Sequence, residues 1–236
     1  TPTYYWGQGF GEGDKDSKKE QYTAQDLDLR PTLYHRLAPN VYLGIGWSLN
    51  AQHATQIDDN DPPKINDTAQ GASVLSSGSS VDLSWDDRDF VPNPRKGQYA
   101  DLRYTRFTPD VGSDTRFDEY QLHYSRYHSL DDKNVLAWEM DGAFAQGEVP
   151  WTMMPLLGSN QRMRGYYEGR YRDKNAVSGQ LEYRRKLDWR HGVVGWLGAG
   201  TMGPSFHSLD DGRWLPSAGV GYRFEFKPRV NVRLDY

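Results

Sequence analysis

Residues 158–185 read GSNQRMRGYYEGRYRDKNAVSGQLEYRR and decide the fold of the chain. The segment begins as a loop rich in Gly and Arg that carries Arg164, Gly165 and Tyr166. It continues into a stretch in which apolar and polar side chains alternate. The apolar set is Val177, Leu181 and Tyr183, and the polar set is Ser178, Gln180, Glu182 and Arg184. A period of two predicts a β-strand with one apolar face.

The same alternation recurs in about ten segments, preceded by an aromatic stub at residues 3–7. Pro31 interrupts one of these segments, 22–36, and predicts a bulge or a local break in pairing. The connections alternate in length. Tight turns are predicted near 37–40, 92–97, 130–134, 188–191 and 227–229, and long loops near 8–21, 54–80, 108–116, 147–175 and 203–214. Short turns at one rim and long loops at the other are typical of an outer-membrane barrel.

The polar face of these strands is heavily charged. Its members are Asp82, Asp86, Arg88, Asp101, Arg103, Glu139, Asp141, Glu182, Arg184, Arg223, Glu225, Arg233 and Asp235. Burying such a set in a dry interior would be prohibitive, whereas a hydrated lumen accommodates both signs as ion pairs on the barrel wall. The sequence therefore predicts an all-β fold, a transmembrane antiparallel β-barrel with lipid outside and water inside.

Composition agrees with this prediction and excludes several classes. The hydrophobic fraction is 36%, below the roughly 45–50% of globular chains, while aromatic residues reach 14%. Acidic and basic residues are well mixed at a net charge of -4, so no basic stripe for nucleic acid is present. The chain has no Cys, which excludes disulfides and thiol chemistry. No segment approaches the ~18 apolar residues that indicate a transmembrane helix.

Three segments carry a resemblance to a known family. The Arg-Gly-Tyr loop with its following strand, the segment WDDRDFVPNPRKGQYADLRY at 85–104 and the segment YHRLAPNVYLGIGW at 34–47 are similar to the outer-membrane assembly-factor superfamily, also called the bacterial surface antigen family. The resemblance implies a barrel of about sixteen strands, many members having POTRA domains in front. Aligned on the loop, residues 1–236 are expected to be a barrel domain incomplete at both ends, lacking about four strands before it and one after it, with no POTRA or soluble domain.

The resemblance also implies a role for Arg164 in a loop that folds into the lumen. There the Arg pairs with an acid of the inner wall, often an Asp on the strand after next, but that position falls near Gly198, where this chain has no acid. Glu182, Glu139 and Asp141 are the candidate partners instead, because only charge-assisted bonds to carboxylates can fix a guanidinium inside a wet barrel. The alternative is an exposed Arg on a mobile loop.

The function predicted is that of a non-enzymatic outer-membrane barrel of the assembly or translocation type. One alternative is a barrel enzyme of the lipase or protease type. His123, or His207 with Asp210 and Asp211, could contribute to such a site, but no G-x-S-x-G nucleophile motif occurs. The other alternative is a passive pore whose charged wall sets its selectivity.

The expected partners follow from the same interpretation. They are the lipid bilayer of the bacterial outer membrane and client outer-membrane proteins or lipids, with a homodimer through exposed strand edges as a further hypothesis. No nucleic acid is expected. No cofactor or metal is predicted, because the six His show no metal-ligand spacing and the cluster at 58–61 is interpreted as a solvated loop rather than a calcium site.

Overall fold

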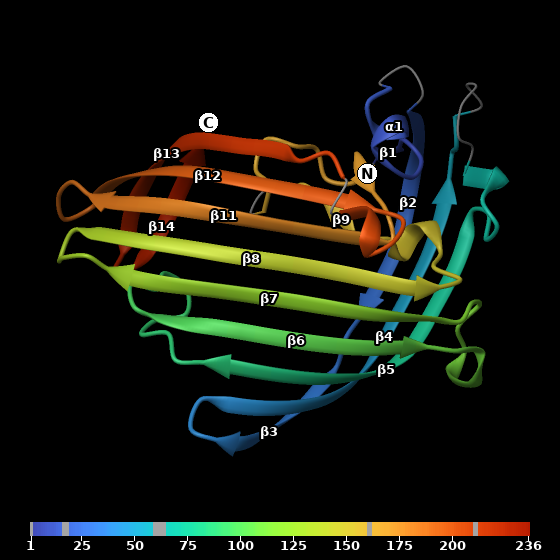
Figure 1. The fold of residues 1–236 in the computed structure, drawn as a ribbon, viewed down its shortest axis with the longest axis horizontal. Helices are drawn as coiled ribbons and strands as arrows, with labels where there is room; N and C mark the ends of the chain where they lie inside the picture. The colour runs from blue at the N-terminus through green and yellow to red at the C-terminus, as the bar shows by residue number, and fades with distance from the viewer. Residues whose placement is uncertain (1, 16–18, 59–64, 160–161, 210–211) are drawn as a thin grey trace.

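One large antiparallel sheet dominates the structure, a computed structural model that describes residues 2–15, 19–58, 65–159, 162–209 and 212–236. Twelve strands pair in the order β1-β2-β4-β5-β6-β7-β8-β11-β12-β13-β14, with β3 also on β4, and the sheet curves strongly (Figure 1). The strands are β1 (Pro2–Tyr5), β2 (Glu20–Leu29), β3 (Thr32–Ala38), β4 (Val41–Thr55), β5 (Ser73–Asp86), β6 (Gly97–Phe107), β7 (Phe117–Ser129), β8 (Asn134–Gly147), β11 (Asn175–Lys186), β12 (His191–Gly203), β13 (Leu215–Lys227) and β14 (Val230–Asp235).

The two faces of the sheet are inverted relative to a water-soluble protein. Apolar side chains of one face are widely exposed, with Leu33 at 81% and Ile45 at 67% of their full accessible surface. The opposite face, here called the charged face, carries Asp82, fully covered, and Glu182, which is only 7% exposed. Asp82 accepts a 2.9 Å bond from Nε of Arg103. Apolar side chains therefore point outward, and the charges are covered within the curve of the sheet.

Proline breaks the second predicted strand into two pieces. β2 and β3 both pair with β4, β2 ending at Leu29 opposite Leu49 and β3 beginning at Thr32 opposite Gly46. Between them the carbonyl oxygen of Pro31 accepts a 3.1 Å bond from the N–H of Trp47. Pro has no N–H to donate to the ladder, so the pairing stops and restarts around it. The predicted local break at Pro31 is confirmed.

The connections alternate between the two ends of the sheet as predicted, but two of the predicted lengths are wrong. Residues 73–80 of the predicted loop 54–80 belong to β5, and the β5–β6 connection spans 87–96 rather than a tight turn at 92–97. The end at which β3 joins β4, β5 joins β6, β7 joins β8, β11 joins β12 and β13 joins β14 is here called the turn end. The opposite loop end holds the longer connections with the short helices α1 (Phe10–Gly13), η2 (Ile65–Asp67), η3 (Pro109–Val111), η4 (Trp151–Met153) and η5 (His207–Leu209). Among the described residues, none of the helices is long and apolar enough to cross a membrane.

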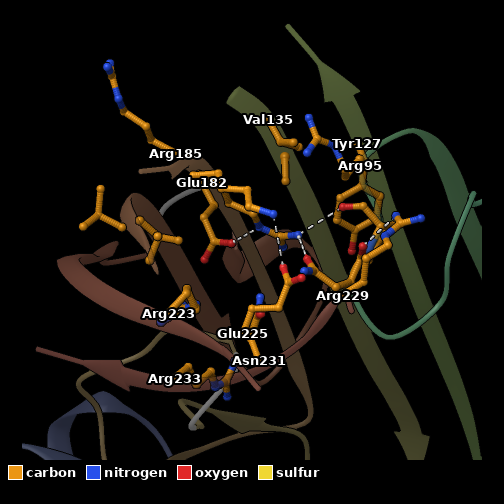
Figure 2. Close-up of a pocket in the computed structure, with 18 of the residues that line it drawn as sticks. Arg95, Tyr127, Val135, Glu182, Arg185, Arg223, Glu225, Arg229, Asn231 and Arg233 are labelled. Atoms are coloured by element: carbon orange, nitrogen blue, oxygen red, sulfur yellow. Dashed lines mark hydrogen bonds and ion pairs between the residues drawn. The ribbon is translucent and has the colours of Figure 1, made fainter. Parts of the chain in front are cut away.

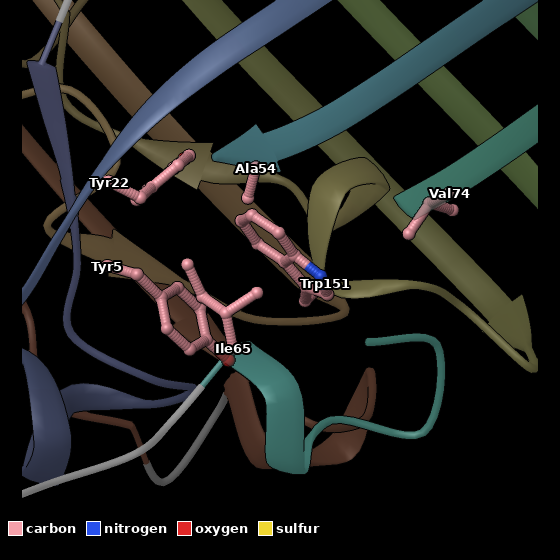
Figure 3. Close-up of a cluster of buried hydrophobic side chains, with 6 residues drawn as sticks. All are labelled: Tyr5, Tyr22, Ala54, Ile65, Val74 and Trp151. Carbon is pink, nitrogen blue, oxygen red and sulfur yellow. The ribbon is translucent and has the colours of Figure 1, made fainter. Parts of the chain in front are cut away.

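Apolar side chains are buried together beneath the long loops. Trp151 of η4 is 2% exposed, and its ring centroid lies 5.0 Å from that of Tyr5 and 5.6 Å from that of Tyr22 (Figure 3). Its Nε1 donates a 3.0 Å bond to the carbonyl oxygen of Gly71, which satisfies the one polar atom of the ring. Ile65 completes the contact from η2. This cluster joins the N-terminal strand to the loop that carries Arg164.

Candidate functional site

The loop between β8 and β11 carries the Arg-Gly-Tyr motif and folds back on itself. Its two short strands, β9 (Leu156–Leu157) and β10 (Tyr171–Arg172), pair with each other, Leu157 opposite Tyr171. Arg172 is 5% exposed and donates a 3.0 Å bond to the carbonyl oxygen of Trp151. The base of the loop is therefore a small two-stranded unit fixed to the buried cluster at the loop end.

Arg164 is buried on the charged face of the sheet, with only 7% of its surface exposed. Its Nη2 donates a 2.6 Å bond to Glu182 of β11, and its Nη1 donates a 2.9 Å bond to Asp235 of β14. The guanidinium carbon lies 3.8 Å from the ring centroid of Trp196 on β12, and Nε is 3.3 Å from Oε1 of Gln180. The planar guanidinium therefore bonds two carboxylates at once and also stacks on the face of an aromatic ring.

The two residues after Arg164 fix the path of the backbone. Gly165 has a φ of +100°, a conformation that residues with a side chain rarely adopt. Tyr166 donates a 2.7 Å bond from its hydroxyl to the carbonyl oxygen of Pro216. The hydroxyl of Ser217 donates a 2.7 Å bond to the carbonyl oxygen of Arg164. These contacts tie the loop to β13 independently of the Arg164 side chain.

The three acids singled out from the sequence have different surroundings. Glu182 contacts Arg164 directly and also accepts a 2.6 Å bond from Nε of Arg184. Glu139 is one step removed, because the side chain of Gln180 stands between it and Arg164 and donates to it at 3.3 Å. Asp141 is instead paired with Arg162 at 2.9 Å and with His123 at 2.7 Å. Of the three candidates, only Glu182 pairs with Arg164 in the described part of the chain.

Sequence reasoning missed Asp235, Trp196 and Ser217 as contacts of Arg164. Alternation along 230–235 did put Asp235 on the charged face, but β11 and β14 are separated by two strands in the sheet. The contact exists because the curved sheet brings its inward side chains toward the loop. Gly198, where the family pattern expects an acid, pairs with Gln180 in the sheet register.

The two histidines considered for an enzyme site lie on different elements, His123 on β7 and His207 on η5. Nδ1 of His123 lies 2.7 Å from Asp141, which stands directly opposite it in the β7–β8 register. His207 belongs to η5 at the loop end, while Asp210 and Asp211 lie outside the described residues, as do Asp59, Asn60 and Asp61 of the acidic cluster. Among the residues with a described placement, no group of three or more His, Asp or Glu is arranged to hold a metal ion.

Comparison with known families gives the decisive observation. The profile of the Omp85 superfamily domain matches residues 4–227, nearly the whole chain. The chain belongs to the Omp85 superfamily. The resemblance noted in the sequence is therefore confirmed, as is the antiparallel outer-membrane β-barrel fold. An Omp85 barrel resides in the bacterial outer membrane.

A solved structure of an Omp85 protein has the same fold. BamA from Haemophilus ducreyi lacking POTRA domains 1-3 superposes with a TM-score of 0.67 at 16% sequence identity. The match covers 92% of this chain but 51% of the BamA chain, so the chain spans about half the length of that structure. No curated protein matches the chain by sequence. At this identity the likeness concerns the Omp85 fold and not a particular activity.

Proposed function

We propose that residues 1–236 are the barrel domain, or part of it, of an outer-membrane protein of the assembly or translocation type, in which the loop carrying Arg164 lies in the lumen. The observation that supports this most strongly is the environment of Arg164. Its guanidinium is 7% exposed and bonded to Glu182 at 2.6 Å and to Asp235 at 2.9 Å. An exposed ion pair on a mobile loop would contribute only about 0–1 kcal/mol and would not order the loop.

The proposed role of the loop is to brace the curved wall. Glu182 and Asp235 stand on β11 and β14, with β12 and β13 between them in the sheet. Arg164 reaches both, so it holds the wall at a defined curvature on the charged face. A wall held in this way can loosen locally when the loop moves, which is the property that strand insertion or substrate passage requires. The bilayer is one partner, and unfolded outer-membrane proteins or lipids are the proposed clients.

No residue is given a catalytic role. A barrel of the assembly type and a passive pore are expected to differ in ion conductance. A lumen that contains the loop conducts ions weakly, and release of the loop raises the conductance. In planar bilayers we expect Arg164→Ala to conduct more than the parent chain. A parent chain with a large, steady conductance equal to that of Arg164→Ala would favour the pore.

Client folding gives the direct test. The chain is reconstituted in vesicles, a urea-unfolded outer-membrane barrel protein is added, and its rate of folding is followed by the heat-dependent gel shift. We expect faster folding than in vesicles that contain an equal mass of an unrelated passive barrel, and loss of this difference in Arg164→Ala. Equal rates with this chain and with the passive barrel would refute the assembly role while leaving the fold assignment intact.

A further inference from the structure

The connection between β5 and β6 crosses the turn end of the sheet. Residues 87–96, here called the strap, are held by guanidinium groups from distant elements. Arg184 of β11 donates from Nη1 to Oδ1 of Asn93 at 3.3 Å and to the carbonyl oxygen of Pro94 at 3.2 Å. Arg229, between β13 and β14, donates from Nη2 to Asp89 at 2.8 Å and to the carbonyl oxygen of Asn93 at 2.9 Å. Most of these acceptors are neutral.

The strap lines a cavity of about 470 Å³ that is strongly basic. Ten Arg and Lys residues contribute to its lining, against three Glu. Asp89 and Asp235, which pair with lining arginines, bring the count to ten cations against five carboxylates. The whole chain has a net charge of -4, so this is a local concentration of positive charge. Figure 2 shows Arg95, Glu182, Glu225 and Arg229 gathered around this cavity from different elements.

Two buried polar atoms on the cavity wall have no hydrogen-bond partner among the described residues. They are Nε of Arg229 and Oδ1 of Asn231, which stand two residues apart. Unpaired buried polar atoms are rare in folded proteins, because each costs the solvation it has lost. Oδ1 of Asn231 is an acceptor and does not itself favour an anion. Nε of Arg229 is a donor without an acceptor in the described part of the chain, and the excess of Arg and Lys around it attracts an oxyanion.

We propose that this cavity binds a phosphate group. Guanidinium groups bond phosphate oxygens through contacts in which both donor and acceptor are ionised, whereas in their bonds to carbonyl oxygens only the donor is charged. Arg184 and Arg229 approach from different elements, and the tetrahedral oxygens of a phosphate can accept from several directions, which the two coplanar oxygens of a carboxylate do less well. The volume also accommodates a group attached to the phosphate.

Phosphate binding competes with the strap for the same donors. The bonds of Arg184 to Asn93 and Pro94 are 3.2 Å or longer and have neutral acceptors, so they are the first to be replaced. The bond of Nε of Arg184 to Glu182 at 2.6 Å keeps that guanidinium in place while the strap is displaced. The strap then remains attached through the ion pair of Asp89 with Arg229. An anion in the cavity would in this way loosen the turn end without dissolving the ion pairs of the wall.

Calorimetric titration of the chain in detergent micelles with inorganic pyrophosphate tests the site. We expect saturable binding that weakens with salt, and a loss of affinity of about 10-fold to 100-fold in Arg184→Gln and in Arg229→Gln, the effect of one charged hydrogen bond. Arg116→Gln is the matched control, because Arg116 is 59% exposed at the loop end, and it should bind like the parent chain. The heat-dependent gel shift of each variant shows that it is folded. Equal losses in all three variants would overturn the proposal.

Two further arms identify the source of the phosphate and avoid dependence on variants. Micelles doped with phosphatidic acid are compared with micelles doped with diacylglycerol, which lacks the phosphate. Binding of phosphatidic acid alone assigns a lipid headgroup, binding of pyrophosphate assigns a soluble phosphate compound, and binding of neither overturns the proposal. In the parent chain, bound phosphate should protect Arg184 and Arg229 from phenylglyoxal. Unchanged modification of both residues at saturating pyrophosphate would also overturn it.

Discussion

Asp235 accepts a 2.9 Å bond from Arg164, although 71 residues separate them in the chain. Asp235 also accepts from Arg223, and Glu182, the second acceptor of Arg164, also accepts from Arg184. The five side chains thus form one alternating series of cation and anion across the charged face. Each of these two carboxylates is shared by two guanidiniums, so neither is buried without a counter-charge.

Removing the central cation of this series tests its contribution to stability. We expect Arg164→Ala to lower the free energy of unfolding by about 3–5 kcal/mol, the cost of breaking a buried ion pair. The loop should then become sensitive to chymotrypsin after Tyr166. Arg162→Ala is the matched control, because Arg162 is 54% exposed and its pair with Asp141 is worth about 0–1 kcal/mol. Similar losses in both variants would contradict the role given to burial.

Because Gly219 has no side chain, the Trp196 ring can lie against its backbone. The two residues are opposite in the β12–β13 register, and a Cβ at Gly219 would collide with the ring and lie 2.5 Å from the carbonyl oxygen of Tyr236. We expect Gly219→Ala to cost about 1–3 kcal/mol and to displace the ring under Arg164, measured as faster cleavage of the loop by chymotrypsin. Gly195→Ala should behave like the parent chain, since its Cβ would approach Gly219 only to 3.9 Å.

A substitution at Leu122 tests whether the apolar face of the sheet is surrounded by lipid or by water. It is 45% exposed in β7, between Leu102 and Gly142 in the register. We expect Leu122→Arg to lower the free energy of unfolding in lipid vesicles by about 2–4 kcal/mol, because a cation would enter hydrocarbon. Leu130→Arg, in the turn after β7 and 52% exposed, should cost only about 0–1 kcal/mol. Urea titrations that gave no difference would mean that this face meets water.

Acid should release the strap through Asp89. Burial raises the pKa of Asp89, but the N–H groups of Arg95 and Lys96 and the guanidinium of Arg229 outweigh it, so its pKa lies below the ordinary 3.8. A lowered folded-state pKa contributes stability that is present above the unfolded-state pKa and lost as pH falls through the folded-state value. We therefore expect the difference in unfolding midpoint between the parent chain and Asp89→Asn to be constant above about pH 5 and to shrink below 3.8.

Removing Arg229 tests whether its guanidinium stabilises the carboxylate of Asp89. In an Arg229→Gln background the difference between Asp and Asn at position 89 should be smaller at neutral pH, because one of the groups that stabilise the carboxylate is gone. The backbone N–H groups of Arg95 and Lys96 remain as donors in both backgrounds. An undiminished difference would mean that Arg229 does not hold the strap.

Much of the fold was predictable because its signals are local. A pleated strand places successive side chains on opposite faces, so alternation at 175–186 assigned Glu182 and Arg184 to the charged face without any knowledge of the partner strands. Pro31 predicted the break between β2 and β3, because it has no N–H to donate to a neighbouring strand. Strict up-and-down alternation of the strands placed successive connections at opposite ends, although the strap at 87–96 is longer than the β6–β7 connection at 108–116. Glu182 could also be predicted as a partner of Arg164, because it lies on the strand that directly follows the loop.

The sequence alone determined which residues of the predicted strands face inward and to which family the barrel belongs, since each depends on backbone geometry or on a continuous motif. It missed the first half of β5, residues 73–80, because that stretch is rich in Ser and has few apolar side chains to alternate. The tertiary structure decided that Arg164 bonds Asp235, that Asp141 is engaged by Arg162 and His123, and that Arg229 holds the strap at Asp89. Those contacts join elements up to 140 residues apart. They depend on how strongly the sheet curves and on the path of each connection, which arise from the sum of contacts throughout the chain.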